Sequence, residues 1–127
     1  MNNNRRIEKV SSLLKKEISL IIMNDLNDDL IIENFVSVTK IELSGDLQYS
    51  KVFISTPAEE EIKTLILNSL NSAKTRIRFI LGQRVKMRRI PDLVFKMDRV
   101  LDQGLAVLKV LDKLRKTSDQ SDQSDQG

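Results

Sequence analysis

The densest chemical feature of the sequence is a run of six basic side chains within fourteen positions, with no acid among them. They are Arg76, Arg78, Arg84, Lys86, Arg88 and Arg89. If residues 84–88 are extended, a period of two puts Arg84, Lys86 and Arg88 on one side, each about 6.6 Å from the next. Three cations that face one way suit the phosphate backbone of a polyanion. A merely solvated basic loop is the alternative, but uncompensated like charges repel each other, which favours a binding role.

A second group of cations lies near the N-terminus. Residues 5–23 carry apolar side chains at spacings of three and four, which predicts an amphipathic helix with one stripe for the core. The other face of this helix carries Arg5, Arg6 and Lys9. Basic side chains on an exposed helix face are common, and Glu8 and Glu17 partly offset these charges. We therefore treat the three cations as auxiliary to the first group.

The composition excludes most enzyme chemistry. Cysteine and histidine are both absent, which excludes disulfides, thiolate nucleophiles, Cys/His zinc sites and imidazole bases. Residues 25–29 resemble the start of a calcium loop but lack its glycine and its final carboxylate. Glu59, Glu60 and Glu61 suit the first turn of a helix better than a metal site. We expect no catalytic residue, no metal and no cofactor. A carboxylate-dependent enzyme is the remaining catalytic alternative, although no motif brings two acids together.

The charge balance favours an anionic partner. Three of the 18 acids and none of the 21 bases lie in residues 117–127, so residues 1–116 hold 21 bases against 15 acids, a charge of +6. Such a balance suits phosphate or another anionic surface. Aromatic residues make up only 4% of the chain. We expect four of them to pack in the core or on a sheet rather than to stack on bases: Tyr49, Phe53, Phe79 and Phe95.

The length of 127 residues indicates one domain. We assign it to residues 1–116. Residues 117–127 contain three repeats of Ser-Asp-Gln and no apolar residue, which predicts a disordered tail. No stretch reaches the ~18 uninterrupted apolar residues of a membrane span, and charged residues interrupt the apolar run after Arg6, which argues against an export signal. We therefore expect a small cytosolic binding protein.

Two runs rich in β-branched residues predict a β-hairpin. The alternation in residues 35–43 shifts its phase, which predicts a bulge near Lys40, and residues 48–55 alternate again. Between these runs Ser44-Gly45-Asp46 is a turn sequence, in which Gly45 can adopt a positive φ. A third short strand is predicted at residues 93–97.

The helices are predicted from capping residues and apolar stripes. Thr56 and Glu59 can form a capping box with Pro57 in the first turn, and Gly82 can end this helix. Polar residues that compete with the backbone predict a kink in its middle, at Ser72, Ala73, Lys74 and Thr75. Asp98 is predicted to cap a last helix that ends near Lys116. The order α-β-β-α-kink-α-β-α indicates an α+β fold, with helices covering a three-stranded sheet.

Three stretches resemble the ribosome-binding factor A family. Residues 38–55 are similar to the family's hairpin. Residues 82–98 match its most specific block, G-x-x-(V/L)-x-(L/M)-R-x-(V/I)-P-x-L-x-F-x-x-D, and the opening helix matches through Arg5-Arg6-Ile7 and Lys16-Glu17-Ile18. The likeness covers about residues 3–115. It implies a KH-like domain of the type II order, with a helix–kink–helix element in place of GxxG. The family usually has Ala-x-Gly at that kink, whereas this chain has Ala73-Lys74-Thr75.

The resemblance implies a ribosome-assembly factor that binds free 30S small subunits. Such a factor assists late maturation and processing of 16S rRNA near its 5′-terminal helix, without catalysis, and supports growth in the cold. The expected partners are 16S rRNA and the 30S subunit, and we expect a cytoplasmic monomer. The six cations of residues 76–89 would form the principal rRNA contact, with Arg5, Arg6 and Lys9 as auxiliary RNA-binding residues. A protein-interaction module, whose amphipathic helices pack against a partner helix, is the alternative function.

Overall fold

The computed structural model describes residues 2–100, so Met1 and residues 101–127 lie outside the description. Its elements in chain order are α1 (Asn2–Leu20), the π-helical turn η1 (Ile21–Asp25), α2 (Asp29–Glu33), β1 (Ser37–Leu43), β2 (Tyr49–Ser55), α3 (Glu60–Ser72), α4 (Lys74–Arg84) and β3 (Asp92–Met97). The helix predicted up to Lys116 lies almost wholly outside the described residues, and the predicted tail lies entirely outside them.

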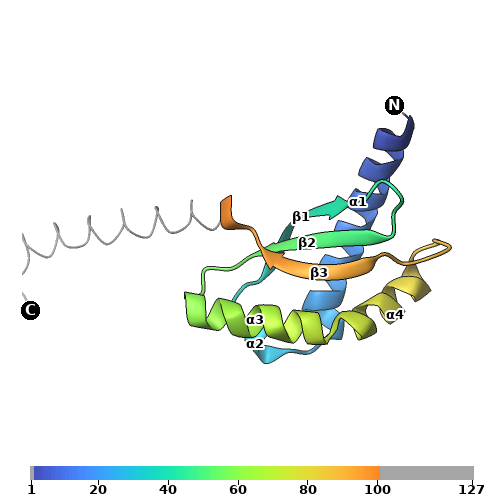
Figure 1. Cartoon of the computed structure of the whole chain (residues 1–127). Coiled ribbons are helices and arrows are strands. Elements are labelled where there is room, and N and C mark those ends of the chain that lie inside the picture. The colour runs from blue at the N-terminus through green and yellow to red at the C-terminus, as the bar shows by residue number, and fades with distance from the viewer. Residues whose placement is uncertain (1, 101–127) are drawn as a thin grey trace, which may run out of the picture.

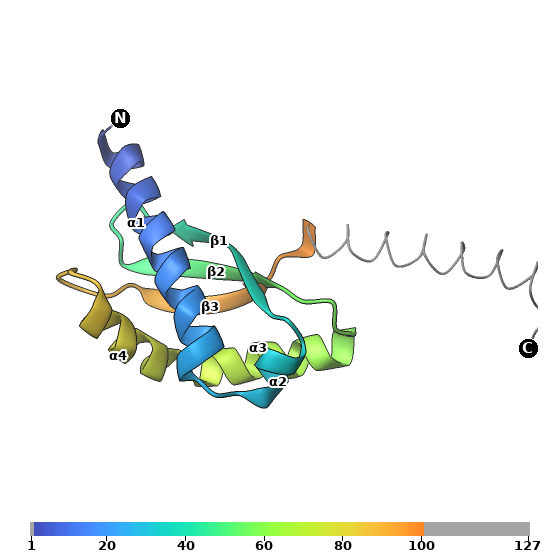
Figure 2. The same ribbon diagram turned by 180° about the vertical axis from the view of Figure 1, so that it is seen from behind.

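The three strands form one sheet in the order β1-β2-β3. β1 and β2 are antiparallel, and their register shifts between Val38 and Lys40, at the predicted bulge. β2 and β3 are parallel, because α3 and α4 return the chain to the end of the sheet at which β2 begins. Figures 1 and 2 show α1 crossing one face of this sheet, while no described helix covers the other face. The predicted α+β fold, a three-stranded sheet covered by helices, is confirmed.

An apolar core lies between the sheet and the helices. α1 contributes Leu14 and Ile18 at the predicted helical spacing, and the sheet contributes side chains that alternate along each strand. The main members are Leu14, Ile18, Ile21, Ile22, Val52, Ile54, Ile66, Leu70, Ile77, Leu81, Leu93 and Phe95. Most strand residues that point the other way are exposed, namely Lys40, Glu42, Tyr49, Lys51, Val94 and Lys96. Most apolar side chains of the long helices are therefore buried in the protein's own core, whereas Leu13, Leu20, Leu65 and Phe79 remain exposed.

Asn71 of α3 closes the free edge of β3. The backbone N–H of Phe95 donates to Asn71 Oδ1 at 3.0 Å, and Asn71 Nδ2 donates to the carbonyl of Phe95 at 3.3 Å. An edge strand leaves such backbone groups unpaired unless something covers them. This amide therefore fixes α3 beside the sheet just before the break between α3 and α4.

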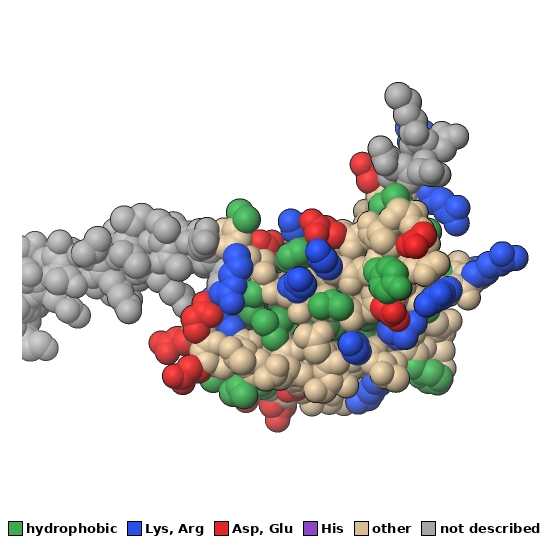
Figure 3. All heavy atoms as spheres, in the orientation of Figure 1, with side chains coloured by type: hydrophobic (Ala, Val, Ile, Leu, Met, Phe, Trp, Pro, Cys, Tyr) green, Lys and Arg blue, Asp and Glu red, His purple; other side chains and the backbone are tan. Residues whose placement is uncertain are grey.

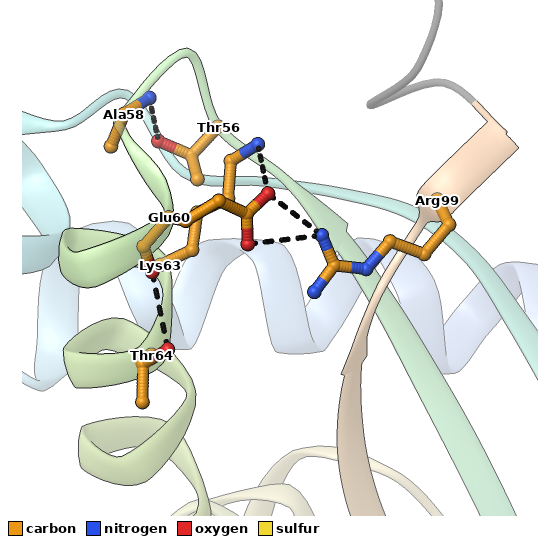
Figure 4. Close-up of polar contacts among 6 residues, drawn as sticks. All are labelled: Thr56, Ala58, Glu60, Lys63, Thr64 and Arg99. Carbon is orange, nitrogen blue, oxygen red and sulfur yellow. Dashed lines mark hydrogen bonds and ion pairs between the residues drawn. The ribbon is translucent and has the colours of Figure 1, made fainter.

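The predicted helix start at Thr56 is wrong, because α3 begins at Glu60 with Glu59 as its N-cap. The buried Thr56 hydroxyl instead donates to the carbonyl of Asn34 at 2.5 Å and accepts from the N–H of Ala58 at 3.3 Å. These bonds join the segment after β2 to the end of α2. The Thr56 hydroxyl is therefore not the cap of α3, which begins four residues later. Figure 4 shows Thr56 beside Ala58, and Glu60 between Lys63 and Arg99, with Glu60 paired to Arg99 at 2.9 Å.

Two glycines do not have the predicted roles. Gly82 lies inside α4, which continues to Arg84. The positive φ in the hairpin turn belongs to Leu47, at 60°, while the φ of Gly45 lies outside the left-handed range. Leu47 is thus the left-handed residue of the turn, and its N–H donates to the carbonyl of Ser44 at 3.0 Å.

Candidate nucleic-acid interface

Three of the six predicted cations are held by the protein itself. Arg84 of α4 pairs with Asp25 of η1, with 2.8 Å between Nη2 and Oδ2. Arg76 Nη2 donates to the backbone carbonyl of the same Asp25 at 3.0 Å. Arg78 pairs with Asp92 at the start of β3, at 3.3 Å, and donates to the carbonyl of Ile90 at 2.9 Å. These arginines fasten α4 to η1 and to the segment before β3.

The expected alternation of residues 84–88 is correct only after the helix ends. Arg84 is still helical, and its side chain turns back toward η1. Val85 has an extended backbone, and the chain bends again at Arg88 and Arg89. Burial alternates along this stretch: Val85 is buried, Lys86 is exposed, Met87 is half-buried and Arg88 is exposed. The expectation that Arg84 lies on the same side as Lys86 and Arg88 is therefore wrong, because the helix is two residues longer than Gly82 predicts.

The other three cations lie next to the start of α1. A groove of about 660 Å³ is lined by Arg6 and Val10 of α1, residues 46–48 of the hairpin turn and residues 86–89. A second hollow, which shares Arg6 and Val10, is lined also by Arg5 and Lys9. The structure thus joins the auxiliary cations to half of the principal group. We call this set the basic surface: Arg5, Arg6, Lys9, Lys86, Arg88 and Arg89.

All six side chains of the basic surface are exposed. Within residues 2–100 none of them forms an ion pair with an acid. Figure 3 shows Lys and Arg side chains gathered at the end of the molecule where α1 begins and the α4–β3 connection protrudes. An open cluster of this kind attracts phosphate through charge and remains free to contact it.

Asp46 lines the groove of this cluster, and its carboxylate is hydrogen-bonded within the hairpin turn. Its Oδ1 accepts from the Ser44 hydroxyl at 2.6 Å and from the N–H of Gln48 at 3.1 Å. These bonds, chiefly the one from Ser44, lower the pKa of Asp46 below the ordinary 3.8, and the charge of Arg89 lowers it slightly more. Asp46 therefore stays ionised and helps to position the turn that forms one wall of the groove.

We expect Ser44→Ala to raise the pKa of Asp46 more than Arg89→Ala does, since the hydroxyl bond is the larger cause. Because the folded pKa lies below the unfolded one, this carboxylate stabilises the fold fully above the unfolded value. That contribution is lost as pH falls through the folded pKa. An NMR titration of the side-chain carboxyl carbon measures both variants. A larger rise in Arg89→Ala would contradict this order of causes.

The break between α3 and α4 lies at Ala73, whose φ of −90° and ψ of 0° require no glycine. Thr75, at the position of the family's glycine, lies inside α4 with Lys74. Ser72, Lys74 and Thr75 are exposed. α4 has 11 residues, which separates the kink from residues 86–89 by about 16 Å along the helix. The structure therefore does not bring the kink residues into the basic surface.

Sequence reasoning missed the hairpin turn as part of the site. Leu47 and Gln48 line the groove beside Arg88 and Arg89, and the carbonyl of Gln48 accepts from the N–H of Asp92 at 2.9 Å. Nothing in the spacing of the sequence signals this contact, because it follows from the parallel pairing of β2 with β3. Only the knowledge that these strands are neighbours would have placed the turn beside residues 86–89.

Three of the four aromatic residues expected in the core or on the sheet lie on strands, namely Tyr49, Phe53 and Phe95, whereas Phe79 lies on α4. Phe95 is buried, and Phe53 lies under Lys40 Nζ, 4.7 Å from the ring centroid. Tyr49 and Phe79 are exposed, at 58% and 67%. Neither lines the grooves of the basic surface. Among the described residues, no group of three acids could hold a metal ion, and no helix is long and apolar enough to cross a membrane.

Comparison with known proteins identifies close relatives. Residues 6–111 match a family model described as ribosome-binding factor A. A ribosome-binding factor A from Prochlorococcus marinus strain AS9601 is 57% identical over 115 residues, which cover 91% of this chain and 88% of that protein. Another, from a Picosynechococcus strain, is 40% identical over 114 residues, which cover 90% of this chain and 87% of that protein.

Solved structures agree with the sequence comparisons. The crystal structure of ribosome-binding factor A from Thermus thermophilus matches with a TM-score of 0.64 and 29% identity, over 73% of this chain and 97% of that one. A Thermus thermophilus homology model, fitted into a cryo-EM map of a complex between the 30S subunit and ribosome-binding factor A, matches with a TM-score of 0.58. It is 31% identical, over 70% of this chain and 91% of that one.

Proposed function

The chain belongs to the ribosome-binding factor A family, and on that premise we propose that it binds free 30S small ribosomal subunits and assists late maturation and processing of 16S rRNA near its 5′-terminal helix. Members of this family are ribosome-binding factors and not enzymes, so the activity is binding without catalysis. The Thermus relative fitted into a map of its 30S complex supports the choice of partner. We also propose that the protein is a cytoplasmic monomer and that it supports growth in the cold.

The basic surface is the observation that carries this proposal. It offers six exposed cations, drawn from α1 and from the connection between α4 and β3, without an internal ion pair among the described residues. No aromatic side chain of the described residues lines its grooves. A surface of this composition binds RNA through backbone charge and shape rather than by stacking or base reading.

A binder of this kind acts on rRNA by selecting a conformation. It shifts the rRNA only by the difference between its affinities for two arrangements. Low temperature prolongs the lifetime of misfolded helices, so a factor that favours the productive arrangement is most useful in the cold. Arg76, Arg78 and Arg84 support this activity indirectly, because they hold α4 and the segment before β3 in place.

We expect the affinity for rRNA to depend steeply on salt. About four engaged phosphates predict a slope near −3 when log K is plotted against log salt concentration. Fluorescence anisotropy with labelled 16S rRNA fragments, over a series of KCl concentrations, measures this slope. A slope close to zero would show that apolar or neutral contacts dominate, and would contradict a charge-driven interface.

Crosslinking to isolated 30S subunits, with mapping of both sides, tests the proposal as a whole. The expected protein crosslinks lie in residues 5–9 and 86–89, and the expected RNA crosslinks lie in 16S rRNA. Crosslinks restricted to ribosomal proteins would overturn the rRNA contact while leaving subunit binding intact. Crosslinks that cluster on the exposed apolar residues of α1, α3 and α4, namely Leu13, Leu20, Leu65 and Phe79, would favour a protein-interaction module instead.

A further inference from the structure

A small apolar patch lies away from the basic surface, where η1 and α2 meet β1. Met23, Ile32 and Phe35 are 63%, 49% and 76% exposed. They surround a hollow of about 140 Å³, whose floor is formed by the buried Ile31 and Val36. Large apolar side chains that gather on a surface, rather than occurring singly, are typical of interaction sites.

Phe35 occupies a backbone position that normally requires glycine. α2 ends in a Schellman motif: Phe35 N–H donates to the carbonyl of Ile32 at 3.4 Å, and Val36 N–H donates to the carbonyl of Ile31 at 3.5 Å. Phe35 is the left-handed residue of this motif, with a φ of 52°. Glycine is usual there because a Cβ is strained in this conformation, and a bulky residue is an outlier.

The strain at Phe35 is not offset by packing within the described chain. Its ring is the most exposed of the described aromatic side chains, so it contributes little to the core. Local strain that persists without internal benefit is concentrated at functional sites. The geometry therefore favours a ring that is presented to something outside this chain.

The rim of the patch is acidic. Asp29 and Glu33 lie four residues apart on α2, next to Ile32, and both are exposed. Within residues 2–100 neither forms an ion pair. Arg76 and Arg84 reach η1 from α4, but Asp25 engages them. An apolar centre with unpaired carboxylates beside it repels phosphate and complements a cationic partner.

We propose that the patch of Met23, Ile32 and Phe35 docks a basic amphipathic segment of another protein. One apolar side chain of that segment enters the hollow, the next ones pack on Met23 and Phe35, and its lysines or arginines face Asp29 and Glu33. The basic surface lies at the opposite end of α1, about 22 Å away along the helix. One end of the molecule would then bind RNA while the other binds protein, and the two sites can be tested separately.

A lysine–leucine peptide tests the proposal on the full-length protein. The probe is a synthetic helix of about 14 residues, with leucines along one face and lysines on the others. Titration followed by NMR is expected to shift the signals of Met23, Ile32 and Phe35. The same peptide with glutamate in place of lysine is expected to bind much more weakly, because it meets the carboxylates of α2.

Phe35→Gly separates docking from folding. Glycine suits the left-handed position, so this variant is expected to unfold at the same temperature as the wild type or higher. Loss of the ring is expected to weaken peptide binding by more than about tenfold, as for a central apolar contact. The matched control is Phe79→Ala, which removes another largely exposed ring, from α4 and outside the patch. Asp29→Asn with Glu33→Gln is expected to weaken binding and reduce its salt dependence.

Four results would overturn the proposal. Equal binding by Phe35→Gly and the wild type would show that the patch is not the site. A short RNA that shifts the same signals would identify a nucleic-acid site instead. Self-association that Phe35→Gly abolishes would make a second copy the occupant. Changes in the signals of residues 101–116 on Phe35→Gly, without peptide binding, would show that the chain covers the patch with its own segment.

Discussion

Replacing Lys86, Arg88 and Arg89 with glutamate is expected to weaken binding to 30S subunits by about two orders of magnitude. Each exposed phosphate contact contributes roughly 1 kcal/mol, so three lost contacts amount to about a hundredfold, and the new acids add repulsion. The unfolding temperature is expected to stay within about 2 °C of the wild type, because no internal ion pair of the described residues is broken. A pelleting assay with isolated subunits and a thermal melt give the two readouts.

The matched control reverses the same amount of charge on another face. Lys40, Lys51 and Lys96 are exposed on the open side of the sheet, and their replacement by glutamate changes the net charge equally. This control is expected to retain most of the binding. Equal loss in both triple variants would show that only net charge matters, and unchanged binding in the first variant would refute the basic surface as the rRNA contact.

Arg84→Glu is expected to destabilise the protein by about 1–2 kcal/mol, in contrast to Lys86→Glu two positions further on. Arg84 pairs with Asp25 at 2.8 Å, and both side chains are about two-thirds buried. A glutamate there removes the link between α4 and η1 and places two carboxylates together. Chemical denaturation measures the change in the free energy of unfolding. Lys86→Glu is expected to leave that energy unchanged and to weaken subunit binding.

A charge swap distinguishes the ion pair from a general effect of residue 84. The double variant Asp25→Arg with Arg84→Glu is expected to recover part of the lost stability, since the pair is restored in reverse. Recovery is incomplete because the backbone carbonyl of Asp25 also accepts from Arg76. If Arg84→Glu alone has the stability of the wild type, Arg84 is not fastened to η1 in solution and returns to the set of free cations.

The elements that depend on local patterns were largely predictable. The spacing of Leu14 and Ile18 predicted the buried face of α1, and the phase shift near Lys40 predicted the bulge of β1. Element ends were less predictable, because they depend on contacts between loops. Thr56 bonds to Asn34 rather than capping α3, and the left-handed residue of the hairpin turn is Leu47 rather than Gly45.

The amino-acid order alone was sufficient to establish that the chain has a surplus of cations in residues 76–89, no Cys or His chemistry, and a helix-covered three-stranded sheet. Charge, composition and hydrophobic period are local properties, so they can be read without coordinates. Which cations remain unpaired is not a local property. Asp25 forms an ion pair with Arg84, and Asp92 forms one with Arg78, although both acids are distant in sequence from their partners. The parallel pairing of β2 with β3 then brings Lys86, Arg88 and Arg89 beside Arg6. Tertiary packing thus selects the interface from a larger set of candidates, because ion pairing depends on distance in space rather than along the chain.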